Sequence, residues 1–73
     1  MTIQEHDIVV LTTARPELAL QPGDVGTVVH LSTGEAAEVE FTTAAGDTIA
    51  VVTLPVNQLR PPTASDVAAV RTA

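Results

Sequence analysis

Glu38 and Glu40 are the side chains whose type and spacing come closest to a chemical site in this sequence. They lie two residues apart in the segment 37–42, where apolar residues alternate with them, so a strand would project both carboxylates from one face. Two neighbouring carboxylates can move protons in acid–base catalysis or hold a hard cation. A glutamate pair is also ordinary on the solvent face of an antiparallel sheet, and we expect that structural role here.

The other polar side chains give no catalytic or metal-binding pattern. His6 and His30 lack the short spacing of a metal-binding motif. The hydroxyls of Ser32, Thr33 and Ser65 suit turns and helix caps. The chain has no cysteine, which excludes disulfides, thiolate nucleophiles and cysteine-ligated zinc. We therefore expect no enzymatic activity, no cofactor and no metal site.

The charge balance restricts the class of partner. Nine carboxylates against three arginines and no lysine give a formal net charge of −6. Binding to nucleic acids or to anionic membranes depends on cations, so we expect neither partner, whereas an acidic surface suits a basic protein. Arg60 is the one cation of the segment 55–62, and we expect it to pair with Glu40 or Asp24, or to contact a partner.

A chain of 73 residues has room for one domain with a modest core. No apolar run approaches the ~20 residues that span a bilayer, and the N-terminal residues are acidic where a signal peptide would be positive. We expect a cytoplasmic protein. Small folds without disulfides or metals often rely on oligomerisation or on a partner.

Four β-rich segments separated by turn residues predict an antiparallel meander. We expect strands over 7–12, 25–31, 37–42 and 48–54, and a very short fifth strand at 59–60. Pro55 suits the start of a single helical or 3-10 turn ahead of that last strand. The pattern is that of a small all-β, SH3-like barrel over residues 1–61, followed by a flexible or helical tail over 62–73.

Turn and bend residues support this architecture. Pro22 fixes φ for the second position of a turn and Gly23 accepts a positive φ at the third, which predicts a type II turn ending at Asp24. Gly26, inside a β-branched run, indicates a bulge, a tight bend or the close approach of another backbone. Gly46 belongs to the next hairpin turn.

The second and fourth strands are apolar on both faces, although a barrel this small has a single interior. Some of their side chains should therefore lie outside, where exposed apolar groups mark an interaction surface. The candidate interface residues are Val28, Val52, Leu54, Glu38, Glu40 and Arg60. Because no lysine guards the sheet edges, we also expect self-association at micromolar concentration.

Four motifs together carry a resemblance to a known family. They are Gly-Asp-Val-Gly-Thr-Val-Val at 23–29, Glu-Val-Glu-Phe at 38–41, Gly-Asp-Thr-Ile-Ala at 46–50 and Leu-Arg-Pro at 59–61. Through them residues 6–61 resemble the short bacterial proteins known as domain of unknown function 4926. The resemblance implies a compact SH3-like barrel that is an accessory or antitoxin-like partner and not an enzyme.

The function expected from these observations is a non-enzymatic, acidic protein-binding module. Its partner would be the product of a neighbouring gene, a second copy of the chain, or both. One alternative is a nucleic-acid-binding barrel, because the 23–29 run is similar to the KOW-like motif of ribosomal and transcription factors, although the lysines that usually accompany it are missing. The other alternative is a small metal-dependent or hydrolytic protein.

Overall fold

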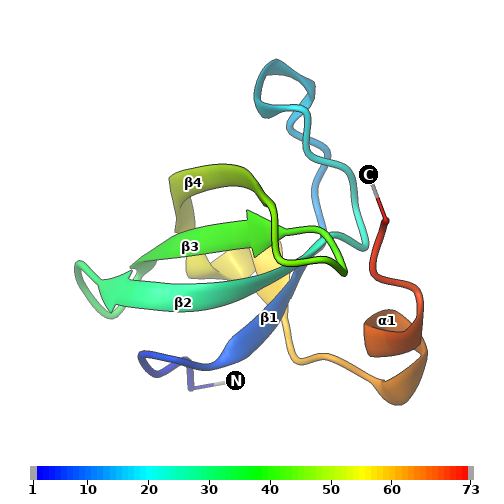
Figure 1. Ribbon diagram of the computed structural model, residues 1–73. Coiled ribbons are helices and arrows are strands. Elements are labelled where there is room, and N and C mark those ends of the chain that lie inside the picture. Colours follow the sequence, from blue (N-terminus) through cyan, green and yellow to red (C-terminus); the bar gives the residue numbers. More distant parts are fainter. Residues whose placement is uncertain (1, 73) are drawn as a thin grey trace.

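Five antiparallel strands curl into a half-barrel in the computed structural model, which describes residues 2–72 (Figure 1). The order of strands across the sheet is β4-β3-β2-β1-β5. In chain order the elements are β1 (Ile8–Leu11), the 3-10 turn η1 (Pro16–Leu18), β2 (Val25–Leu31), β3 (Ala36–Thr42), β4 (Thr48–Pro55), the 3-10 turn η2 (Val56–Gln58), β5 (Leu59–Arg60) and the helix α1 (Ala64–Ala68). The predicted fold class is confirmed, including the 3-10 turn before the last strand.

Met1 and Ala73, the outer limits of the predicted barrel and tail, lie outside the described residues. The predicted domain boundary after residue 61 stays a prediction. Within residues 2–72, α1 is a single short helix of five residues, and no helix has the length and apolar character needed to cross a bilayer.

The core lies on the concave side of the sheet and follows the alternation of β3. Ala37, Val39 and Phe41 of this strand are fully buried, and the residues between them are half-buried on the other face. The buried core cluster consists of Val9, Leu11, Leu20, Val28, Ala37, Val39, Phe41, Leu54 and Leu59. Because Phe41 is the only aromatic residue, the core depends on several aliphatic side chains, each contributing about 1.5–3 kcal/mol on burial.

The curl of the sheet depends on a close approach of β2 to β3 at Gly26. A Cβ atom at this position would lie 2.6 Å from Cγ1 of Val39 and 3.0 Å from the backbone oxygen of Glu40. Only glycine leaves room for this approach. Three residues further on, the register of β2 against β3 shifts between Val28 and His30, and such a bulge increases the local bend.

Two glycines hold the turns at the ends of β2 and β3. Gly23 has a φ of 94°, and the backbone N–H of Asp24 donates to the carbonyl of Gln21 at 3.1 Å, the geometry of a type II turn. Gly46 has a φ of 90° and donates to the carbonyl of Thr43 at 3.0 Å in the hairpin between β3 and β4. Both values lie in the left-handed region that favours glycine.

The C-terminal tail is docked on the barrel. The helix α1 starts with a capping box, in which the Thr63 hydroxyl accepts from the N–H of Asp66 and the Asp66 carboxylate accepts from the N–H of Thr63. Beyond α1, the guanidinium of Arg71 donates to the carbonyl of Ala19 at 2.8 Å, and its own carbonyl accepts from the N–H of Ala44 at 2.9 Å. The C-terminal segment accordingly runs past the loop that precedes β2 (Figure 1).

Candidate functional site

The convex side of the sheet, here called the outer face, brings Glu38 and Glu40 together at its centre. Both alternate with buried residues of β3, so their side chains point away from the core. The strand registers place two rows across this face, His30–Glu38–Thr53 and Ile8–Thr27–Glu40–Val51. Each carboxylate therefore has one neighbour on β2 and one on β4.

The carboxylates of the outer face are not paired with cations. The Thr48 hydroxyl donates to Oε2 of Glu40 at 2.7 Å, a neutral contact that orients the carboxylate. Nδ1 of His30 lies 3.3 Å from Oε2 of Glu5, which places one further carboxylate beside this face. Among residues 2–72, the ion pairs do not include Glu38 or Glu40.

All three arginines are engaged elsewhere in the molecule. The pairs are Arg15 with Glu17 at 2.9 Å, Arg60 with Asp66 at 2.7 Å and Arg71 with Asp24 at 3.3 Å. Since the chain has no lysine, it has no further side-chain ammonium or guanidinium group to offer the outer face. The negative charge of that face is left without an internal arginine counterion, which favours an external cation.

The partner of Arg60 differs from the sequence-based expectation. Glu40 and Asp24 were the expected partners, but the guanidinium makes two parallel hydrogen bonds with the carboxylate of Asp66, at 2.7 and 2.8 Å. This forked geometry is the strongest form of an arginine–carboxylate contact. The hydrogen bonds from Arg60, followed by those from Thr63, hold the pKa of Asp66 well below its usual range. Arg60 therefore fastens the tail to β5.

The apolar residues expected at an interface are only partly on the surface. Val28 and Leu54 are fully buried in the core and are not part of an exposed apolar surface, and Val52 is half-buried on the same side. In β4 the inward positions are Ala50, Val52 and Leu54, opposite the buried residues of β3. The expectation was wrong for Val28 and Leu54 because the face on which a strand residue lies depends on the strand register, which local sequence does not specify.

The exposed apolar residues of the sheet are instead Val51 and Val29, which adjoin the expected Val52 and Val28 in the sequence, and Ile8 of β1. Val51 is 55% exposed, Ile8 is 43% exposed and Val29 is 39% exposed. Val51 and Ile8 stand at the two ends of the row that contains Glu40. Val29 lies at the bulge of β2, where the register shift turns an additional apolar residue outward. The outer face thus combines central carboxylates with apolar margins.

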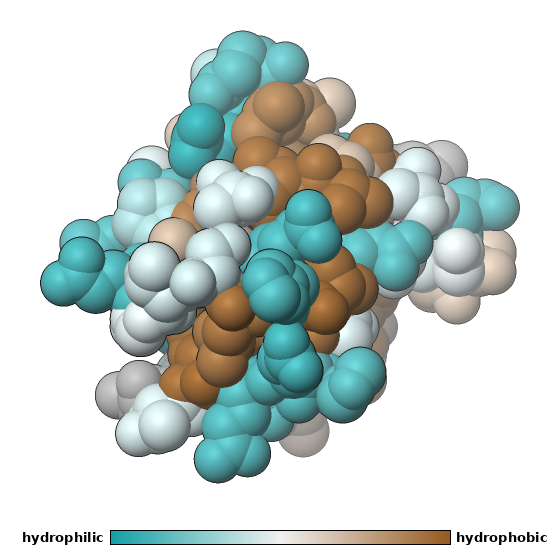
Figure 2. Space-filling model, turned by 90° about the vertical axis from the view of Figure 1, so that its left-hand side faces the viewer, coloured by the Kyte–Doolittle hydropathy of each residue, from teal (hydrophilic) through white to brown (hydrophobic). Residues whose placement is uncertain are grey.

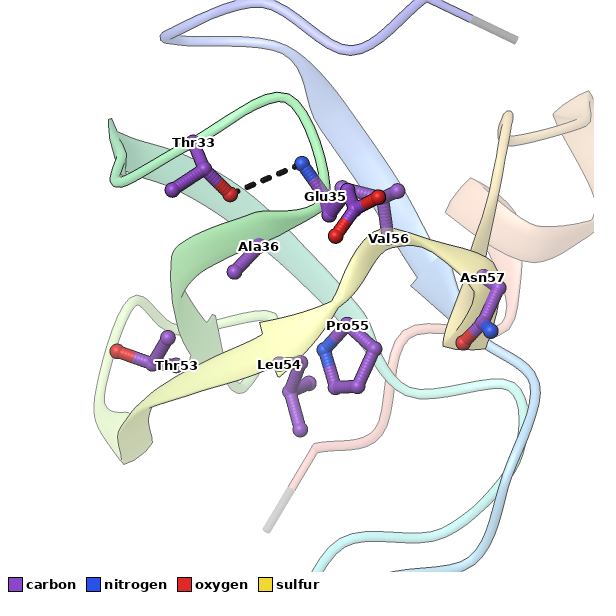
Figure 3. A pocket seen from close by; sticks show the side chains of 8 residues that line it. All are labelled: Thr33, Glu35, Ala36, Thr53, Leu54, Pro55, Val56 and Asn57. Atoms are coloured by element: carbon purple, nitrogen blue, oxygen red, sulfur yellow. Dashed lines mark hydrogen bonds between the residues drawn. The ribbon is translucent and has the colours of Figure 1, made fainter.

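A shallow groove of about 730 Å³ lies beside β4, at its C-terminal end (Figure 3). Its lining comes from the turn before β3, the first residue of β3, β4 and η2, and comprises Thr33, Glu35, Ala36, Thr53, Leu54, Pro55, Val56 and Asn57. The Thr33 hydroxyl accepts from the N–H of Glu35 at 3.0 Å and fixes the turn. Figure 2 shows that apolar surface forms an interrupted band across this side of the molecule, with hydrophilic residues between.

The remaining candidates for catalysis or metal binding do not assemble into a site within residues 2–72. No group of three or more potential metal ligands is present in this part of the chain. The Thr33 hydroxyl has the turn role expected for it, and Ser65 lies in the first turn of α1. Sequence reasoning missed the open edge at Val51 and Thr53, although a signal was available: the segment 48–58 contains no charged residue.

These observations define a class, a small all-β protein built as a curled five-stranded antiparallel sheet with an acidic outer face. Residues 5–61 match the family described as domain of unknown function (DUF4926), and the chain belongs to that family. The match covers the barrel and ends before α1. No curated protein and no solved structure matches the chain.

Proposed function

We propose that this protein is a non-enzymatic binding module for a basic protein, an accessory or antitoxin-like partner of a neighbouring gene's product. The observation that carries the proposal is the outer face, where Glu38 and Glu40 lie side by side without a cation while every arginine is engaged elsewhere. Lysine or arginine side chains of a partner would form ion pairs with those carboxylates.

The apolar residues at the margins of the outer face favour a protein, and not a small cation, as its binding partner. Ile8 and Val51 stand at the two ends of the row that contains Glu40, and both are substantially exposed. A partner that covers this face would bury apolar surface at the margins and place its cations at the centre. The apolar contact would contribute affinity, and the charges would contribute specificity and association rate.

The charge balance argues against the nucleic-acid-binding alternative. A barrel that binds RNA or DNA needs several lysines or arginines directed at phosphates. The three arginines here make contacts within the chain, and Glu38 and Glu40 give the outer face of the sheet negative charge. Phosphates would be repelled from the outer face.

The test is to co-express the protein with the products of its adjacent genes and to titrate any complex by calorimetry at two salt concentrations. We expect binding that weakens with salt, because salt screens the contacts between opposite charges. The double variant Glu38→Gln with Glu40→Gln should bind at least about tenfold more weakly. The matched control, Glu17→Gln with Glu35→Gln, removes the same charge elsewhere and should bind as the wild type does.

Two outcomes would overturn the proposal. Equal losses in the two double variants would show that net charge, and not the outer face, determines binding. Salt-sensitive micromolar binding of an oligonucleotide to the isolated protein would favour the nucleic-acid-binding barrel instead.

A further inference from the structure

The strand β4 is an open edge of the sheet, because it is last in the strand order and pairs only with β3. The N–H of Val56 donates to the carbonyl of Glu35 at 2.8 Å, so these two opposite residues form a hydrogen-bonded pair between the chain segments of β4 and β3. In an antiparallel pair, hydrogen-bonded residue pairs alternate with non-bonded ones. Ala50, Val52 and Leu54 therefore bond to β3, and the backbone groups of Val51 and Thr53 point away from the sheet.

This edge lacks the features that normally prevent strand addition. Natural edge strands are protected by charged side chains, by short length or by a covering segment. The eight residues of β4 include no charged residue, and Val51 is 55% exposed. The one protective residue is Pro55, which sits at the C-terminal end of the strand and has no N–H to donate.

We propose that two copies of this chain associate by pairing β4 with β4, antiparallel, about a two-fold axis at Val52. In this register Val51 of each copy faces Thr53 of the other, so that all four of their free N–H groups meet free carbonyls. A shift of two residues in either direction is poorer. One shift would place Val51 opposite Pro55, which lacks a donor, and the other would place Thr53 opposite Ile49, where the ladder with β3 is already irregular.

The side chains agree with the same register. Val51 and Thr53 lie on the outer face, and directly opposite β-branched residues form favourable cross-strand pairs. Pro55 would face Ile49 of the second copy, which brings a half-buried apolar side chain towards the groove lined by Leu54 and Val56. The symmetric contact thus covers both the edge and part of the groove beside it.

Charge does not oppose this contact at moderate salt. Along one row of the paired sheets, Glu38 of one copy and Glu40 of the other would be three strand spacings apart, about 14 Å. That separation exceeds the Debye length of about 8 Å at physiological ionic strength, but it is well within the length of about 30 Å at 0.01 M salt. Glu35 and Asp47 lie near the ends of the contact and add to the repulsion between the two copies, which salt likewise screens. Self-association should therefore strengthen as salt is added.

The contact is confined to one edge strand and an adjacent groove, which places it towards the small end of the range for specific interfaces. We expect micromolar dissociation constants. This inference is independent of the proposed function: binding of a basic partner weakens with salt, whereas pairing of β4 strengthens with it. Either can therefore fail while the other stands.

The experiment is sedimentation equilibrium of the full chain over micromolar to sub-millimolar concentrations, at about 0.02 M and about 0.3 M salt. The wild type should show a monomer–dimer equilibrium that shifts towards the dimer at the higher salt. Val51→Lys should weaken association at least about tenfold, because it places a charge on the pairing edge. Val29→Lys is the matched control, with the same substitution at an exposed valine of β2, and should associate as the wild type does.

A second measurement covers the case in which Val51→Lys fails to fold. Amide hydrogen exchange of the wild type should show protection of the N–H groups of Val51 and Thr53 that increases with protein concentration. A wild type that stays monomeric at both salt concentrations would overturn the proposal. So would equal association of the two lysine variants, or exchange at Val51 and Thr53 that does not depend on concentration.

Discussion

The β5 edge and the β4 edge of the half-barrel differ in length, in charge and in cover. The strand β5 has two residues, and Arg60 in it is held by the tail through Asp66. The strand β4 has eight residues and no charge, and it pairs only with β3. One edge is closed by side-chain contacts with α1, and the other presents free backbone groups.

The difference between the edges follows from where the few cations lie. Arg60 and Arg71 fasten the tail to β5 and to the loop before β2, and Arg15 is hydrogen-bonded to Gln58 of η2 at 3.3 Å. The side-chain contacts of the three arginines do not reach β4 or the carboxylates of Glu38 and Glu40. A chain with three arginines and no lysine therefore leaves its β4 side and outer face to carboxylates and aliphatic groups. The small number of cationic side chains therefore accounts both for the acidic outer face and for a β4 edge without charged residues.

The largest loss of stability should come from a substitution at Gly26, where the close approach of β2 to β3 allows the sheet to curl. Gly26→Val would place atoms where Val39 and the backbone of Glu40 already lie, so we expect destabilisation by about 3 kcal/mol. In a domain of this size that lowers the melting temperature by more than about 10 °C. Gly34→Val is the control, because nothing lies within 4 Å of a Cβ there. Equal melting temperatures of the two variants would contradict the close approach.

A second prediction compares the same substitution, valine to threonine, at a core position and at the β4 edge. Val28→Thr puts a hydroxyl in the core, where Val28 is fully buried, and should cost about 2 kcal/mol. Val51→Thr, on the exposed edge, should change the free energy of unfolding by no more than about 0.5 kcal/mol. Chemical denaturation of both variants at low protein concentration measures the difference. A larger loss for Val51→Thr would reverse the assigned faces.

Deletion of residues 62–73 opens the β5 side by removing the partners of Arg60 and Asp24. The sheet registers end at Arg60, so we expect the shortened chain still to unfold cooperatively, with a smaller decrease in melting temperature than Gly26→Val causes. Differential scanning calorimetry tests this. Loss of the cooperative transition would show that the tail belongs to the folding unit.

The smallest effect should be the pH dependence of the Arg60–Asp66 pair. The pKa of Asp66 is lower in the folded chain than in the unfolded chain, chiefly through its hydrogen bonds with Arg60. Its contribution to stability is therefore complete at neutral pH, declines below about pH 4 and is lost as the pH falls through the folded-state pKa. Thermal melts over a pH series should therefore show that the difference in melting temperature between the wild type and Asp66→Asn narrows as the pH is lowered below about 4.

Asp47→Asn is the matched control for that pH series, since the Asp47 side chain makes no hydrogen bond within the described residues. Its melting temperature should stay close to that of the wild type throughout. A gap for Asp66→Asn that widens on acidification would mean that the direction of the linkage has been assigned wrongly.

Local signals in the sequence predict most of the fold. The β-branched runs give the strand at 25–31 with the bounds that the structure has, and β1, β3 and β4 within a residue or two. The short strand at 59–60, expected just ahead of Pro61 and Pro62, also has the predicted bounds. Pro55 places the 3-10 turn, and Gly23 takes the positive φ that a type II turn requires. Strand and turn preferences act over a few residues, so they can be recognised without knowledge of neighbouring strands.

The alternation in β3 also predicts half of the candidate site. Glu38 and Glu40 share a face because side chains alternate along any strand, and Ala37, Val39 and Phe41 supply the buried positions between them. This strand has a single self-consistent pattern of apolar and acidic residues. No information from elsewhere in the chain was needed to orient it.

The sequence by itself determined the strand segments, the turns, the acidic pair and the net charge, because each depends on residues close together or on composition alone. The tertiary structure decided which valines face outward, since a bulge near Val29 and the register with β3 set the phase of β2 and β4. It also decided that Arg60 pairs with Asp66 and that β4 remains an open edge. Those outcomes depend on which strands and charged groups meet in space, and many pairings were compatible with the same local sequence.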